Sequence, residues 1–222
     1  MPDKDVPENT PTSGDAFDPP AVRAGRRVSE ISIAWTLIAS SLAIALGIAS
    51  GSSALVAFGA VGYVDLVGSV ALVHHFRHAL RTDGLSDHFE QRAHRIVTFG
   101  LLGIGLATVV ISSVRRFGGH HPETSTAGIV LAAVSLVGLG ALATRKVQVA
   151  PRIPSAALRS DGRLSGIGAA QAGVVLVGTG AARAFEWNWA DDTAAIVVGL
   201  VAIVIAVLTF SEPKDGPHQD ES

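Results

Sequence analysis

The sequence contains no cysteine at all. Disulfide bonds, thiolate zinc sites and cysteine nucleophiles are therefore excluded. Charge is also scarce, because Asp, Glu, Lys and Arg make up only 16% of the 222 residues, against about 25% in an ordinary soluble domain. Nine of the 19 acidic residues lie in residues 1–28 and 211–222. The small net charge of −2 gives no reason to expect a nucleic-acid partner.

What remains is strongly apolar, with 48% hydrophobic residues and 24 glycines. Six apolar stretches each approach the ~20 residues that a helix needs to cross the hydrocarbon of a bilayer. Only a helix satisfies its backbone hydrogen bonds within one such segment in lipid. We therefore expect an all-α membrane protein with six transmembrane helices. The six stretches are residues 31–50, 53–73, 96–114, 126–143, 164–182 and 190–210.

The domain organisation follows from the change in polarity along the chain. Residues 1–28 are polar, contain several prolines and lack a hydrophobic period, which predicts a disordered cytoplasmic tail. Residues 29–210 form the predicted six-helix transmembrane domain. Residues 211–222 are short and polar, and we expect a second disordered cytoplasmic tail there.

The distribution of basic residues predicts the orientation in the membrane. With six spans both termini lie on one side, and 14 of the 17 Lys and Arg residues fall on that side. The other three are Arg115, Arg116 and Arg183. Basic loops stay in the cytoplasm, so we expect cytoplasmic N- and C-termini in a multi-pass protein of the cell membrane. Trp187 and Trp189 are then expected at the outer interface, where indoles anchor helix ends.

Asp65 is the most informative residue, because it is the only charge in the apolar segment 53–73. A carboxylate at such a depth costs roughly 2.5–3.5 kcal/mol on insertion scales. Three interpretations are open: Asp65 coordinates or relays a cation, it hydrogen-bonds a neighbouring span, or burial holds it neutral as a vestige. Intramembrane acids usually mark an ion pathway or a binding site.

Three further residues are candidate metal ligands. His74 and His78 are four residues apart at the end of the second span, so they share a helix face, as a two-histidine metal site requires. The alternative is that both are solvated beside Arg77 in the headgroup region. Asp161 stands at the start of the fifth span, where it is either a ligand or a helix-capping acid favoured by the helix dipole.

No motif in the chain indicates catalysis. We find no phosphate-binding loop, nucleophile elbow or metalloprotease helix. Gly100, Gly103 and Gly105 imitate a dinucleotide-binding pattern, but they lie in the middle of a span and read as packing residues. No multi-residue acid–base cluster lies at one depth, so we expect neither an enzyme nor a bound cofactor.

Several short motifs, together with the six spans, resemble the membrane domain of the cation diffusion facilitators. The best match is the small-residue segment 51–59 leading to Asp65, where the facilitators carry a ligand pair at i and i+4. Segments 90–93, 156–161 and 189–191 match the entries to the third, fifth and sixth spans. The resemblance implies a proton-coupled transporter of divalent cations such as zinc that forms a homodimer in the bilayer.

The sequence departs from the family at three ligand positions, which hold Val61, Leu164 and Gly168. We expect no counterpart of the soluble metal-sensing domain that usually follows the sixth span in the facilitators. Two hypotheses therefore stand. In the first, the protein transports a divalent cation, with Asp65 as ligand or proton carrier assisted by Tyr63, Ser69 or Gln171. In the second, it is a non-transporting scaffold or partner subunit with the facilitator fold and a degenerate metal site.

Overall fold

The computed structural model describes residues 19–82, 87–118, 123, 125–149 and 156–211. Within these ranges the chain forms six long helices, as the sequence predicts. They are α1 (Pro19–Ser50), α2 (Ser53–Thr82), α3 (Asp87–Phe117), α4 (Thr126–Val149), α5 (Ala156–Phe185) and α6 (Asn188–Ser211).

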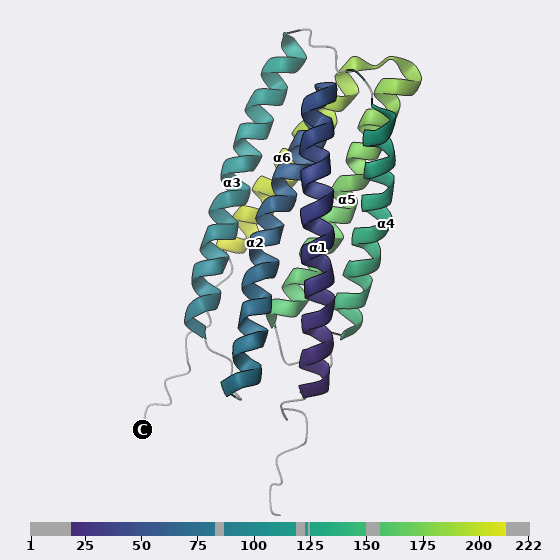
Figure 1. Cartoon of the computed structure of the whole chain (residues 1–222). Coiled ribbons are helices and arrows are strands. Elements are labelled where there is room, and N and C mark those ends of the chain that lie inside the picture. Colours follow the sequence, from purple (N-terminus) through teal and green to yellow (C-terminus); the bar gives the residue numbers. More distant parts are fainter. Residues whose placement is uncertain (1–18, 83–86, 119–122, 124, 150–155, 212–222) are drawn as a thin grey trace, which may run out of the picture.

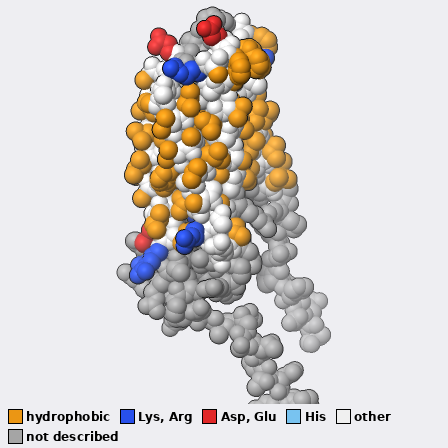
Figure 2. Space-filling view, turned by 90° about the vertical axis from the view of Figure 1, so that its right-hand side faces the viewer, with side chains coloured by type: hydrophobic (Ala, Val, Ile, Leu, Met, Phe, Trp, Pro, Cys, Tyr) orange, Lys and Arg blue, Asp and Glu red, His pale blue; other side chains and the backbone are white. Residues whose placement is uncertain are grey.

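All six helices are long and apolar enough to cross a membrane. Their outward faces carry large exposed hydrophobic side chains along the length of the bundle, from Ile31 and Phe99 to Phe210. Figure 2 shows these apolar side chains covering the surface between charged groups near its ends. Such a surface suits lipid rather than water, so the predicted all-α membrane fold with six spans is confirmed.

Helix α1 begins at Pro19, earlier than its apolar stretch. Residues 19–28, which we predicted as part of a disordered tail, are therefore helical. The reason is that proline is well tolerated in the first turn of a helix, where its missing N–H has no intrahelical partner. Ala21, Arg23, Ala24 and the arginines that follow are good helix formers. Residues 1–18 and 212–222 lie outside the described part of the chain.

The helices run up and down the bundle, so that α1 begins and α6 ends at the same end (Figure 1). We call this the terminal end, and the opposite end, which holds the connection between α1 and α2, the turn end. The closest neighbours are α1 with α2, α3 with α6, and α4 with α5. Sequence-distant helices thus lie side by side, and α2 and α5 meet inside the bundle.

The connection at the turn end between α1 and α2 is very short. Gly51 follows the last residue of α1 with φ 68°, a left-handed conformation that glycine adopts without steric cost. Ser52 then accepts a hydrogen bond from Leu55 N at 3.2 Å and caps α2. This turn fixes α2 against α1.

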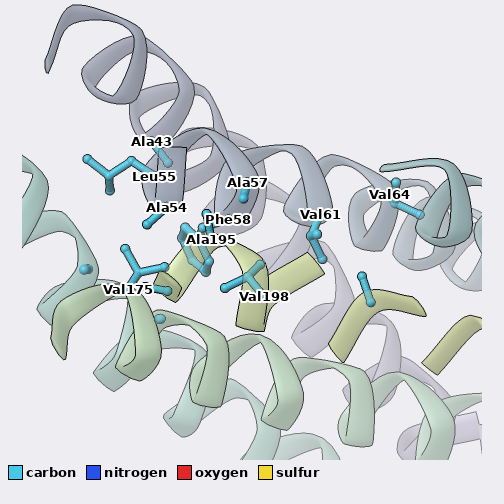
Figure 3. Close-up of a cluster of buried hydrophobic side chains, with 14 of the residues drawn as sticks. Ala43, Ala54, Leu55, Ala57, Phe58, Val61, Val64, Val175, Ala195 and Val198 are labelled. Carbon is cyan, nitrogen blue, oxygen red and sulfur yellow. The ribbon is translucent and has the colours of Figure 1, made fainter. Parts of the chain in front are cut away.

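The core is made mostly of alanine and valine, as Figure 3 shows for Ala54, Ala57 and Val198. Small residues let helices approach closely in a bilayer, where dispersion contacts drive their association. One close approach of two backbones joins α3 and α6. A Cβ on Gly105 would lie 2.7 Å from Gly199 O, and one on Gly199 would lie 2.9 Å from Gly105 O.

We expect Gly105→Ala to destabilise the bundle, because the added methyl group meets a backbone carbonyl that cannot move independently. Overpacking of this kind costs about 1–3 kcal/mol, which thermal unfolding of the detergent-solubilised protein would detect as a lower Tm. Gly103→Ala, two residues earlier on α3, is the matched control because nothing lies within 4 Å of its Cβ position. Equal Tm values for the two variants would contradict the close packing of α3 on α6.

Candidate cation site in the transmembrane bundle

Asp65 lies on α2, where it lines a cavity of about 40 Å³ inside the bundle. This volume exceeds the roughly 10–15 Å³ that holds one water molecule. Most of the wall is apolar. The lining residues are Thr36, Ala39, Ser40, Phe58, Val61, Gly62, Asp65, Val97, Leu101, Leu139, Leu164, Ile167, Gly168, Gln171 and Ile205.

Four polar side chains reach this cavity from three helices: Thr36 and Ser40 of α1, Asp65 of α2 and Gln171 of α5. Gln171 is 3% exposed, and its Nε2 donates to Val198 O at 3.4 Å. That hydrogen bond orients the amide through its nitrogen. The amide oxygen Oε1 is the atom that can accept a hydrogen bond or bind a cation. Ser40 packs against Gly62, since a Cβ there would lie only 2.2 Å from Ser40 Oγ. The cavity therefore offers oxygen donors and a single carboxylate.

The three departures from the facilitator pattern lie in the same cavity. Val61, Leu164 and Gly168 all line it together with Asp65. The fold thus brings together the four positions at which the resemblance implies ligands, although three of them hold no donor. Within the described residues, no group of three or more His, Cys, Asp or Glu side chains could hold a metal ion.

Two of the three residues that we expected to assist Asp65 lie elsewhere. Tyr63 is 36% exposed, and its hydroxyl lies 2.7 Å from that of the exposed Ser41. It sits two residues before Asp65, so a helix turns it about 200° away from the cavity. Ser69 is buried one turn after Asp65 but does not line the cavity. Only Gln171 stands where the hypothesis placed it.

Of the other predicted ligands, His74 is remote from Asp65 along α2. His74 is exposed and nine residues further along α2, a rise of about 13 Å. The side chain of His78 lies outside what the structure describes, as does that of Asp161. Helix α5 begins at Ala156, so Asp161 belongs to its second turn. The helix-capping interpretation of Asp161 was therefore wrong, because charged and small residues before the apolar stretch extend the helix by more than a turn.

Lys146 is a buried residue that we counted only among the basic residues on the side of the termini. Helix α4 continues past residue 143 to Val149 and carries Lys146 into the bundle, where its exposure is 0%. Its Nζ donates to Ser32 Oγ at 2.9 Å and to Ser165 Oγ at 2.8 Å. These contacts join α4 to α1 and α5. A count of basic residues does not indicate which of them is buried.

Asp191 and Asp192, at the start of α6, are a second buried feature that we did not predict; each is 1% exposed. Asp191 Oδ1 accepts a hydrogen bond from Ser52 Oγ at 2.6 Å, and Oδ2 accepts one from Ala54 N at 3.2 Å. Asp191 therefore caps helix α2 from a different helix. It satisfies one of the N–H groups that a helix start leaves without an intrahelical partner.

The whole bundle matches a known family model. The model of the cation efflux transmembrane domain matches residues 30–213, which is most of the chain. Comparison with curated proteins gives no match. The chain therefore belongs to the cation efflux family, the family that the sequence motifs indicated. Its members are transporters rather than enzymes, and this protein is a multi-pass membrane protein of that family.

We expect Asp191→Ala to lower the Tm, because the change leaves Ser52 Oγ and Ala54 N without their acceptor at the start of α2. Hydrogen bonds to a charged group contribute about 1.5–3 kcal/mol. Glu123→Ala at the same end is the control, since that side chain is exposed and the hydrogen bond to Ser50 O comes from its backbone N–H, which the change keeps. A Tm of Asp191→Ala within error of the control would refute the capping role.

Proposed function

We propose that the protein moves a divalent cation across the membrane through the Asp65 cavity in exchange for protons. One observation carries this proposal: Asp65 lines a cavity between the helices of a cation efflux bundle, together with the positions at which the resemblance implies the other ligands. A carboxylate that lines a largely apolar cavity favours a bound cation or proton, because removing a charge from water is costly.

Asp65 can serve both ions in turn. A cation and a proton bind the same carboxylate oxygens, so binding of one displaces the other, which is the basis of an exchange. Gln171 contributes an amide oxygen, and Thr36 and Ser40 contribute hydroxyls to the same space. Water completes the coordination of a cation that one carboxylate cannot hold alone.

Residues near the terminal end supply the first contacts in this proposal. His74 and His78, one turn apart on α2, and Asp161 on α5 capture the cation before it reaches Asp65. We place this end in the cytoplasm and the protein in the cell membrane, on the basis of the basic residues that gather beside the termini. A homodimer is the assembly that the family resemblance implies.

The second candidate function is a non-transporting scaffold or partner subunit. The observation in its favour is that Val61, Leu164 and Gly168 occupy the family's ligand positions in the cavity. Zinc sites ordinarily use four donors, three of them from protein even in open sites. In this case Asp65 would be a structural remnant.

The two functions differ in the flux of purified protein in proteoliposomes. We expect zinc uptake with proton counterflow for the wild type, and a loss of about tenfold or more for Asp65→Asn, because the amide cannot exchange a proton for a cation. Tyr63→Phe is the matched control, two residues away and outside the cavity, and should keep its flux.

The opposite result would be the absence of flux from well-folded wild type with zinc, manganese, cobalt and iron. That result would reject transport and favour the scaffold. Flux that persists unchanged in Asp65→Asn would keep transport but remove Asp65 from its mechanism.

A further inference from the structure

The side-chain atoms that the Asp65 cavity offers to a cation are oxygens. The polar side chains in its wall carry a carboxylate at Asp65, hydroxyls at Thr36 and Ser40, and an amide at Gln171. The amide nitrogen of Gln171 is turned to α6, where it donates to Val198 O. In the part of the chain that the structure describes, no histidine lines this cavity. The sequence has no cysteine and a single methionine, at its first position, so imidazole and sulfur ligands are both missing from the wall.

Thr36 carries a buried hydroxyl that has no hydrogen-bond partner in the protein. Its side chain is 5% exposed, and Oγ1 makes no hydrogen bond. Hydroxyls inside helices commonly bond to the carbonyl four residues earlier, as Thr179 Oγ1 does to Val175 O at 2.8 Å. A buried polar atom without such a bond costs free energy unless water or an ion satisfies it. Because Thr36 lines the cavity, this oxygen points to a ligand there.

The four polar side chains reach the cavity from three helices. Thr36 and Ser40 lie one turn apart on α1, Asp65 lies on α2, and Gln171 lies on α5. Ser40 is packed closely on α2, since a Cβ at Gly62 would collide with Ser40 Oγ. The hydrogen bond of Gln171 to α6 holds its amide in place, so the amide oxygen is the atom left for the cavity. A ligand in the cavity can therefore bind oxygens of α1, α2 and α5 together.

The volume of the cavity suits a cation that keeps part of its water shell. A volume of about 40 Å³ accommodates about three water-sized molecules, because one needs roughly 10–15 Å³. Mg²⁺ prefers an octahedral shell of oxygens, retains several waters and uses only one or two carboxylates. One oxygen from each of the four polar side chains and about two waters would complete such a shell. Structural zinc sites instead use cysteine and histidine and close at four ligands.

We propose that the Asp65 cavity binds a hard divalent cation of the Mg²⁺ type through oxygens alone, with Thr36 Oγ1 as one of its ligands. Carboxylate, carbonyl and water ligands suit magnesium, calcium and manganese, whereas imidazole and thiolate ligands favour zinc. Zinc still enters such a site, but magnesium competes with it. The inference rests on the proposed function, because a bound cation is cargo only if the protein transports it. Binding itself can be measured without flux.

The test measures cation binding to the detergent-solubilised protein. Mn²⁺ is the probe, because it takes oxygen ligands and its electron paramagnetic resonance signal falls when it is bound. The difference between wild type and Asp65→Asn gives the Mn²⁺ held in the cavity, separate from ions at surface carboxylates and histidines. We expect Mg²⁺ and buffered Zn²⁺ to displace this Asp65-dependent Mn²⁺ at free concentrations within about a hundredfold of each other. A site with imidazole ligands would separate the two by about ten-thousandfold or more.

Variants of Thr36 test its part in the site. Thr36→Val removes the hydroxyl and keeps the shape, so we expect the affinity for Asp65-dependent Mn²⁺ to fall about fivefold. Thr36→Ser keeps a hydroxyl and should keep the affinity. Thr179→Val is the matched control, since Thr179 is also 5% exposed but does not line the cavity. Its affinity should equal that of the wild type, and the Tm of each variant reports whether it folds.

Three results would overturn the proposal. The first is the absence of Asp65-dependent Mn²⁺ binding, and the second is bound Mn²⁺ that Zn²⁺ displaces but millimolar Mg²⁺ does not. The third is an equal affinity of Thr36→Val and Thr179→Val, which would remove Thr36 from the ligands. Failure of the proposed function gives a different result, namely Mg²⁺-sensitive, Asp65-dependent binding without flux in proteoliposomes. Asp65-dependent zinc flux that millimolar Mg²⁺ leaves unchanged would uphold transport and reject the hard-cation site.

Discussion

The cost of burying polar groups away from water governs how this bundle is built. Each helix satisfies its own backbone, so the remaining problem is the polar side chains inside. The buried Lys146 donates hydrogen bonds to two serine hydroxyls from neighbouring helices. The buried Asp191 accepts hydrogen bonds at the first turn of α2 and so caps that helix. These contacts tie α1, α4 and α5 together near one end of the bundle, and α2 and α6 together at the other.

Asp65 and Asp191 carry the same chemical group, a carboxylate, but their surroundings give them different roles. Both carboxylates lie within apolar helices, but Asp191 accepts hydrogen bonds from Ser52 and Ala54 and is committed to them. Asp65 lines a cavity beside Gln171 and two hydroxyls of α1. A group that borders open space can exchange its partners, whereas a helix cap cannot do so without loosening the helix. This difference makes Asp65 the centre of the proposed cation site.

Membership of the cation efflux family and the departure from its ligand pattern are compatible in physical terms. The fold depends on close approaches such as that of Gly105 and Gly199, and on small core residues. Neither requires metal donors. The ligand positions can therefore change to Val61, Leu164 and Gly168 while the cavity between the helices persists. In this chain the polar groups of α1 and Gln171 face the space that those donors would otherwise share.

The sequence alone determined the six spans, the family and the importance of Asp65, because lipid demands long apolar helices and makes a charge within one conspicuous. The hydroxyl residues at positions 29, 32, 36 and 40 have a helical spacing in the sequence. Serine and threonine are common in spans, however, and this spacing alone does not distinguish a polar site from ordinary helix packing. Only the tertiary structure decided that Tyr63 faces outward, that Lys146 is buried, and that Thr36 shares a cavity with Asp65. Those outcomes depend on which helices pack together and at what rotation, and spacing along one helix carries no information about the residues of its neighbours.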